Sequence, residues 1–184
     1  RDISAEIDRE NRIITVLLTL VKMDKKNADL QIQHMSINQL LEDILKRLRP
    51  IADKRSIDLI LDSFRPVEAD VDELKFTSAI SNLVENAIKY NVDDGWVRVS
   101  LDADHKYFYV TVADSGMGIP EDSLSRIFER FYRVDKSHSR EIGGTGLGLA
   151  ITRSTIGMHH GVIKVFSKEG EGTTFSVRVP LSYI

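Results

Sequence analysis

The chain has 184 residues, 42% of them hydrophobic, with a formal net charge of −3 and no cysteine. This length and apolar content allow one domain with a substantial core plus a short appendage. The charge gives no electrostatic case for nucleic-acid binding, and the lack of cysteine excludes a disulfide scaffold and thiolate metal sites. No apolar run approaches the roughly 18 residues of a membrane span, and no signal peptide is visible. Because the chain starts inside a helical pattern without Met, we expect it to be a piece of a longer protein.

Residues 1–28 carry an apolar repeat with alternating spacings of four and three. Its members are Ile3, Ile7, Ile14, Leu17 and Val21, with Glu10 as the polar break. Such a heptad pattern predicts a helix that pairs with other helices, here in a dimeric bundle. A lone amphipathic helix lying on the domain stays open as the alternative.

A second helix is expected to begin at Ser36, which forms a capping-box pattern with Gln39. Apolar residues follow at helical spacing as far as Ile51. Pro50 should kink or end this helix, because an interior proline costs about 3 kcal/mol. A strand at 57–61 follows, and we interpret this section as scaffold.

A third helix is expected from a cap at Asp70 or Asp72 to about Asn91. Beside its apolar stripe, spacings of three and four place polar side chains on one face. These side chains are Asn82, Asn86, Lys89 and Tyr90. Taken alone, this pattern favours an ordinary exposed face. The glycine clusters that follow favour a binding site instead.

Alternating residues at 96–101 and 107–113 predict two paired strands. Asp114 would then stand at the end of a strand, where its carboxylate can point into a binding site. The pattern resumes with a helix at 147–158, for which Gly161 is a plausible left-handed end residue. A last hairpin is expected from strands at 162–166 and 174–179. The order of elements predicts a two-layer α/β sandwich with helices on one face of a mixed sheet.

Two glycine clusters flank a polar segment, FERFYR at 128–133. They are DSGMGI at 114–119 and GGTGLGL at 143–149. No lysine follows a glycine at the spacing of a Walker loop, and the second cluster lacks the spacing of a dinucleotide fingerprint. Glycine lets a ligand approach main-chain N–H groups, and a helix start favours phosphate. We therefore predict two rims of a nucleotide pocket joined by a mobile lid, although either cluster alone is equally typical of ordinary turns.

Five segments in order resemble the sequence boxes of sensor histidine kinases. NLVENAIKY at 82–90 is similar to the N box, DSGMG at 114–118 to the first glycine box, and FERFYR to the F box. GTGLGL at 144–149 is similar to the second glycine box, and GEGTTF at 170–175 to the closing Gly-x-Gly-Thr segment. The resemblance implies the Bergerat fold shared with gyrase, Hsp90 and mismatch-repair ATPases, with ATP and Mg²⁺ held between the third helix and the lid.

The resemblance also implies roles for individual residues. Asn86 would coordinate Mg²⁺ with help from Asn82, Lys89 would contact the phosphates, and Tyr90 would pack against adenine. Asp114 would accept a hydrogen bond from the adenine amino group, supported by Thr173 or Thr174. Further nucleotide contacts are implied for Gly116, Gly118, Ile119, Gly144, Thr145, Gly146, Leu147, Gly148, Thr173 and Thr174. Arg130 and Arg133 are candidates to neutralise the transferring phosphoryl group, with a surface ion pair as the alternative.

The family phosphorylates a histidine of its own, and none of the five histidines here has the required context. Residues 1–30 therefore resemble the second helix of the dimerisation hairpin, and residues 31–184 resemble the catalytic domain. A metal site at the adjacent His159 and His160 is disfavoured, because neighbours on a helix do not face each other.

The expected activity is transfer of the ATP γ-phosphoryl group to a histidine, for relay to a response-regulator aspartate. The resemblance implies a homodimer formed through the helical stem, a receiver domain as partner, and a place in the cytoplasmic portion of a membrane-anchored kinase. We expect no contact with nucleic acid or membrane by these residues. A nucleotide-sensing module without chemistry is the alternative. A gyrase-type ATPase is disfavoured, because Asn82 stands where those enzymes carry their glutamate.

Overall fold

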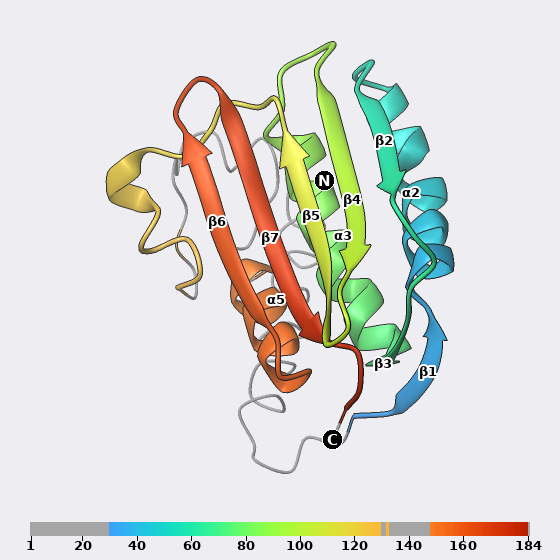
Figure 1. The fold of residues 1–184 in the computed structure, drawn as a ribbon. Coiled ribbons are helices and arrows are strands. Elements are labelled where there is room, and N and C mark those ends of the chain that lie inside the picture. The colour runs from blue at the N-terminus through green and yellow to red at the C-terminus, as the bar shows by residue number, and fades with distance from the viewer. Residues whose placement is uncertain (1–29, 130–131, 133–147, 184) are drawn as a thin grey trace, which may run out of the picture.

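The computed structural model describes residues 30–129, 132 and 148–183, so the predicted stem helix lies outside the described residues. Its centre is a five-stranded sheet of order β2-β4-β5-β7-β6 (Figure 1). The strands are β2 (Asp58–Ser63), β4 (Trp96–Ala103), β5 (Tyr107–Asp114), β6 (Val162–Lys168) and β7 (Gly172–Pro180). β2 runs parallel to β4 and all other neighbours are antiparallel. The sheet is therefore mixed, as predicted.

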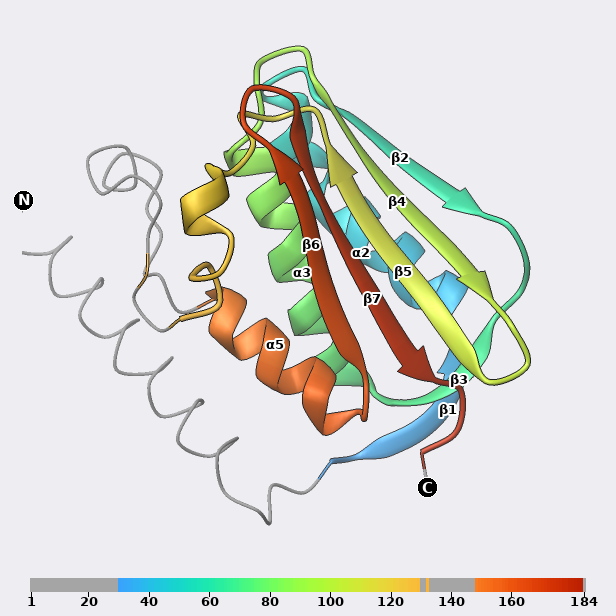
Figure 2. The ribbon, with the colours of Figure 1, turned by 60° about the vertical axis from the view of Figure 1, so that its left-hand side comes forward.

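Three helices lie on one face of this sheet, α2 (Ile37–Asp53), α3 (Glu73–Lys89) and α5 (Gly148–Met158) (Figures 1 and 2). Alternate side chains of β4 and β5 point toward them and are fully buried, as β-strand periodicity requires. Phe76 of α3 packs edge-on against Phe108 of β5, with ring centroids 5.7 Å apart. Helices and sheet thus share one core, which confirms the predicted α/β sandwich.

A second, two-stranded sheet was not predicted. β1 (Ile32–Ser36) pairs antiparallel with β3 (Glu68–Asp72). The side chain of His34 in β1 contacts Asp70 in β3 at 2.8 Å. The paired residues are more than thirty positions apart in the chain, and neither segment is a clear run of residues that favour strands. The local sequence pattern therefore did not predict either strand. Ser36 ends β1 and caps α2 by accepting from the Gln39 N–H at 3.2 Å, which confirms the predicted start.

Pro50 does not end α2, which was one of the two predicted outcomes, because the helix continues to Asp53. An interior proline removes the intrahelical bond that its N–H would donate, and its ring crowds the carbonyl group four residues earlier. Leu48 and Ala52 flank it and are both buried in the core. Their burial holds the last turn in helical form.

The end of α5 also differs from the prediction. His160, at φ 63°, is the left-handed residue, and Gly161 is not. The His160 N–H donates to Gly157 at 2.9 Å, and the Gly161 N–H donates to Ile156 at 2.8 Å, which together form a Schellman motif. Histidine tolerates this conformation better than most non-glycine residues. Glycine is required at 161 for space, since a Cβ there would lie 2.7 Å from the Arg178 carbonyl oxygen.

Within the described ranges, none of the helices combines the length and the apolar character that a bilayer span requires.

Candidate functional site

The polar face predicted on the third helix is present on α3. Asp72 begins this helix by accepting from the Lys75 N–H at 3.0 Å, and its own side chain is buried. Further along the helix, Asn82 and Asn86 are half-buried, and Lys89, the last helical residue, is exposed to solvent. Tyr90, which follows directly, is the C-cap residue of α3. The predicted residues therefore share one helix and its C-terminal turn.

Asn82 joins α3 to the first turn of α5. Its amide Nδ2 donates to the Thr152 hydroxyl at 3.0 Å, and that hydroxyl donates to the Gly148 carbonyl oxygen at 2.9 Å. A Cβ at Gly148 would lie 2.7 Å from Asn82 Oδ1, so the two helices approach at a glycine. The start of α5 is thus fixed beside the amide-bearing face of α3.

Asp114 occupies the end of β5, as predicted. Its Oδ1 accepts from the Gly116 N–H at 2.8 Å and from the Thr173 N–H at 3.2 Å. Burial of the carboxyl raises the pKa of Asp114 to about 6, although the two backbone bonds act in the opposite direction. Its second oxygen, Oδ2, accepts no hydrogen bond from the described residues. Among the described residues, the direct support comes from the backbone N–H of Thr173.

The first glycine box lies directly on the end of α3. The Met117 N–H donates to the Tyr90 carbonyl oxygen at 3.2 Å, and a Cβ at Gly116 would lie 2.5 Å from that same oxygen. Gly118 has φ +72°, and a Cβ there would lie 2.2 Å from the Lys168 carbonyl oxygen. The box is therefore packed between α3 and the β6–β7 turn. Both glycines are required for that approach.

Ile119 follows the first glycine box and is half-buried against the core. Its N–H donates to the Ser167 hydroxyl of β6 at 2.8 Å. That hydroxyl also contacts the Thr173 hydroxyl at 2.8 Å. One serine thus connects the segment after the box to the strand pair that supports Asp114.

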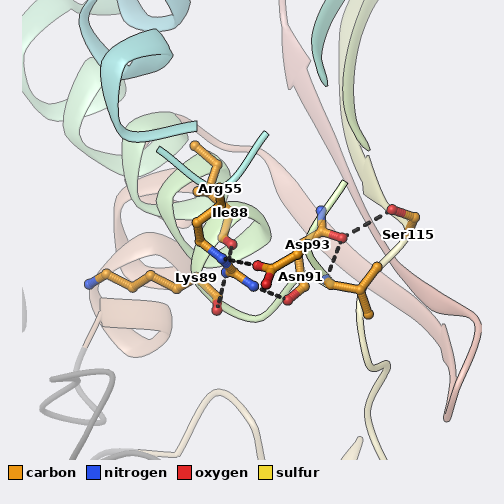
Figure 3. Close-up of polar contacts among 7 residues, drawn as sticks. Arg55, Ile88, Lys89, Asn91, Asp93 and Ser115 are labelled. Carbon is orange, nitrogen blue, oxygen red and sulfur yellow. Dashed lines mark hydrogen bonds and ion pairs between the residues drawn. The ribbon is translucent and has the colours of Figure 1, made fainter. Parts of the chain in front are cut away.

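Three residues of the site were missed by sequence reasoning, namely Arg55, Asn91 and Ser115. Figure 3 shows Arg55, which follows α2, reaching the C-terminal turn of α3. Asn91 is buried, and its Oδ1 accepts from the Ser115 hydroxyl at 3.0 Å (Figure 3). Arg55 and Asn91 belong to no sequence box, and Ser115 lies in the first glycine box without a role predicted for it; their contacts with one another and with α3 appear only in the folded structure. The only local signal was Asn91 itself, a polar residue directly after the N box at a position that is buried.

Several predicted site residues lie outside the described part of the chain. They are Arg130, Arg133, Gly144, Thr145, Gly146 and Leu147. At the start of the F box, Phe128 packs edge-on against Phe175 of β7, with ring centroids 6.2 Å apart. The beginning of this segment is therefore attached to the sheet.

The adjacent histidines point to different surroundings. His159 is buried, its Nε2 accepts from the Asp72 N–H at 3.0 Å, and its Nδ1 donates to the Thr155 carbonyl oxygen at 2.8 Å. The ring of His160 stacks on Tyr183 with centroids 4.6 Å apart. A joint metal site is therefore excluded for this pair by geometry. Histidine 159 is a core residue that fixes the start of α3.

Comparison with family models matches residues 71–183 to the histidine kinase-, DNA gyrase B- and HSP90-like ATPases. This match covers α3, the first glycine box and the whole sheet except β2. The chain belongs to this ATPase family. Within the family, the described domain is the ATP-binding catalytic domain of a sensor histidine kinase, as the sequence boxes predicted.

Similar proteins support this assignment. The sensor histidine kinase WalK of Bacillus subtilis is 34% identical over 178 residues, which are 95% of this chain and 29% of the relative. The sensor histidine kinase RppB of Synechocystis sp. is 36% identical over 174 residues, covering 94% of this chain and 38% of the relative. The chain thus spans about a third of the length of these relatives. The solved catalytic domain of histidine kinase ThkA has a TM-score of 0.74 at 25% identity, covering 83% of this chain and 97% of that chain.

Proposed function

We propose that this histidine kinase domain binds ATP with Mg²⁺ between α3 and the second glycine box, and transfers the γ-phosphoryl group to a histidine. The observation that carries the proposal is the arrangement around Asp114. Its carboxylate is half-buried, one oxygen is oriented by two backbone N–H groups, and the other oxygen accepts nothing from the described residues. The second oxygen is suited to an amino group of a ligand, because a hydrogen bond to an ionised carboxylate is stronger than one between neutral groups.

The adenine end of the ligand would lie at the first glycine box. Asp114 Oδ2 would accept from the exocyclic amino group of adenine, a bond that the carbonyl oxygen of guanine cannot replace. Gly116 and Gly118 lie where a side chain would collide with the backbone of Tyr90 and Lys168, so glycine lets the box pack against the end of α3 and β6, and the base would lie over this backbone. Tyr90 would pack beside the base. Ile119, Thr173 and Thr174 would complete this end of the site.

The phosphate end would lie along the polar face of α3. Asn86 is half-buried, and its side chain accepts no hydrogen bond from the described residues, so its neutral amide oxygen fits a hard cation that phosphate and water oxygens also ligate. Asn82 already donates through Nδ2 to Thr152, which leaves its Oδ1 for the cation or a water bound to it. When bound, Mg²⁺ supplies positive charge that neutralises the phosphates.

Cationic side chains and helix-start amides would hold the triphosphate. Lys89 ends α3 with its ammonium group exposed, and Figure 3 shows this group extending away from the helix terminus. Gly148 begins α5 beside Asn82, so free N–H groups of this helix start would face the phosphates together with residues 144–147. Arg130 and Arg133 would neutralise charge on the transferring group.

In the full-length protein we infer a sensor kinase that dimerises through a helical stem formed in part by residues 1–30, with residues 31–184 as its catalytic unit. The acceptor histidine would lie on the preceding helix, and a response-regulator receiver domain would take the phosphoryl group. The kinase would be anchored in a membrane with this domain on the cytoplasmic side. The similarity to named sensor kinases supports this assignment over a module that only senses nucleotide.

The proposal is tested by calorimetric titration with a non-hydrolysable ATP analogue, with and without Mg²⁺. Asn86→Ala and Asp114→Ala should each weaken binding by about tenfold or more, since each removes a hydrogen bond or ligand to a charged group. Asp62→Asn is the control, because this carboxylate pairs with Arg98 on the sheet, away from α3. Unchanged affinity in both site variants contradicts the proposal. Formation of phosphohistidine by a longer chain that includes the acceptor helix distinguishes the kinase from a sensing module.

A further inference from the structure

Arg55, which no sequence box includes, is the centre of a polar cluster. It stands in the turn between α2 and β2, and its guanidinium reaches the C-terminal turn of α3 (Figure 3). Nη1 donates to the carbonyl oxygens of Ile88 at 2.5 Å and Lys89 at 2.9 Å. Nη2 donates to the Asn91 carbonyl oxygen at 2.5 Å. One side chain therefore binds the backbone carbonyl groups of the last two residues of α3 and of Asn91, just beyond the helix.

The Ile88 and Lys89 carbonyls belong to the last turn of α3, where the negative end of the helix dipole lies. The Ile88 oxygen also accepts from the Asn91 N–H at 3.3 Å. The C-terminal turn of α3 also bears Lys89 and Tyr90, which the proposed function assigns to the phosphates and the base. Uncompensated negative charge at this place opposes a polyanionic ligand. The guanidinium neutralises it, and its planar fork of donors fits several carbonyls at once, whereas a lysine ammonium is a single point charge.

The same turn is bonded to the strand that ends at Asp114. Asn91 Oδ1 accepts from the Ser115 hydroxyl at 3.0 Å, and Asn91 Nδ2 donates to the Trp96 carbonyl oxygen at 2.9 Å. The Met117 N–H donates to the Tyr90 carbonyl oxygen at 3.2 Å. A displacement of the turn would therefore move Lys89, Tyr90 and the first glycine box relative to one another.

We propose that Arg55 is a positioning residue for nucleotide binding, which fixes the C-terminal turn of α3 so that Lys89, Tyr90 and the first glycine box keep their spacing. This inference rests on the proposed function. Arg55 also pairs with Asp93 at 3.1 Å, but Asp93 is 79% exposed, so this ion pair contributes little. The carbonyl bonds are the functional contacts.

Arg49 provides a matched control. It lies on α2, the helix that precedes Arg55, and its Nη1 also donates to a backbone carbonyl oxygen, that of Leu59 in β2, at 3.3 Å. Loss of this contact should affect the packing of α2 on β2 and not the end of α3. Comparison of Arg55→Met with Arg49→Met therefore separates positioning of the nucleotide site from general stabilisation by an arginine on a carbonyl.

The experiment measures the dissociation constants of a non-hydrolysable ATP analogue and of adenosine, together with Tm, for the wild type, Arg55→Met, Arg55→Lys, Arg49→Met and Asp93→Asn. All titrations are made well below every Tm. Arg55→Met should weaken binding of the analogue about tenfold or more, as loss of several charge-assisted hydrogen bonds predicts. Its loss for adenosine should be smaller, since Lys89 belongs to the held turn. Arg55→Lys should lose most of the affinity as well, while Arg49→Met and Asp93→Asn should bind like the wild type.

Equal affinity of wild type and both Arg55 variants overturns the inference, as does an equal loss in Arg49→Met. If Arg55→Met does not fold, Arg55→Lys gives the decision by the same comparison, because it keeps the charge and loses the fork. A wild-type chain that binds no nucleotide overturns the proposed function itself, and this result is seen before any variant is compared.

Discussion

The amide nitrogen of Asn82 and the hydroxyl oxygen of Thr152 lie 3.0 Å apart and connect α3 to α5. Thr152 is buried, and its hydroxyl also donates to the Gly148 carbonyl oxygen within its own helix. The bond therefore fixes the orientation of one of the two N-box asparagines. It also fixes the distance between the helix that carries the asparagines and the first turn after the second glycine box.

Thr152→Val removes the hydroxyl with little change of shape, so it should destabilise the domain by about 1 to 3 kcal/mol by leaving the Asn82 amide without its partner. Urea unfolding of the wild type, Thr152→Val, Asn82→Ala and the double variant measures the coupling. A coupling energy of about 0.5 to 1.5 kcal/mol is expected for a neutral hydrogen bond. Strict additivity of the two single variants would show that the contact contributes nothing.

Nucleotide affinity should decrease as the pH falls through about 6 because of Asp114. Burial raises the pKa of this carboxyl to about 6, so below about pH 6 the carboxyl of the free domain is protonated. Binding of the adenine amino group requires the ionised carboxylate. A ligand that donates a hydrogen bond to the carboxylate favours its ionised form, and its affinity is highest above the pKa. Titrations from pH 5 to 8 should show this loss for the wild type.

Asp114→Asn is the control for that pH profile. It keeps an oxygen for the Gly116 and Thr173 N–H groups and removes the titration. Any remaining pH dependence in this variant belongs to the ligand phosphates, so the difference between the two profiles isolates Asp114. Parallel profiles for wild type and variant would contradict the assignment of Asp114 as the acceptor for adenine.

His159 should make stability depend on pH in the acid range. Burial lowers the pKa of His159, and its Nε2 accepts from the Asp72 N–H in the neutral form. A base whose pKa is lower in the folded state stabilises the fold above its unfolded pKa, about 6.5, and loses that contribution as the pH falls toward the folded value. Thermal unfolding of wild type and His159→Gln between pH 7.5 and 5 measures it. The wild type should lose more stability than the variant, and equal losses would show that His159 does not titrate on unfolding.

Gly116→Ala should weaken both folding and nucleotide binding. The added Cβ would lie 2.5 Å from the Tyr90 carbonyl oxygen, a backbone atom that cannot move alone. The first glycine box must then move away from the end of α3, and we expect a loss of about 1 to 3 kcal/mol of stability, as for other overpacked sites. Thermal unfolding and titration with the ATP analogue check both effects.

Gly157→Ala is the matched control for this substitution. It lies within α5 with no atom within 4 Å of the added Cβ, so it should raise stability by about 0.5 to 1 kcal/mol through helix propensity. Nucleotide affinity should not change. If both alanine variants behave alike, the close approach of Gly116 to Tyr90 has no functional importance.

The parts of the fold predicted from sequence are those in which cause and effect lie close together in the chain. The cap at Ser36, the polar face of α3 and the position of Asp114 follow from spacings of a few residues. The pairing of β1 with β3 and the contact of Arg55 with the end of α3 depend on residues more than thirty positions apart. The left-handed His160 was missed for another reason, because glycine next to it offered the more favourable conformation in isolation.

β7, the last of the five strands in chain order, lies between β5 and β6 in the sheet. It also carries Thr173, whose N–H orients Asp114. During synthesis, a nascent chain that has produced everything through β6 still lacks the strand that joins β6 to the rest, and the carboxylate that we assign to adenine lacks one of its two donors. The domain therefore acquires a complete sheet and a complete adenine-binding end in the same late step, so a prematurely terminated chain should not compete for ATP.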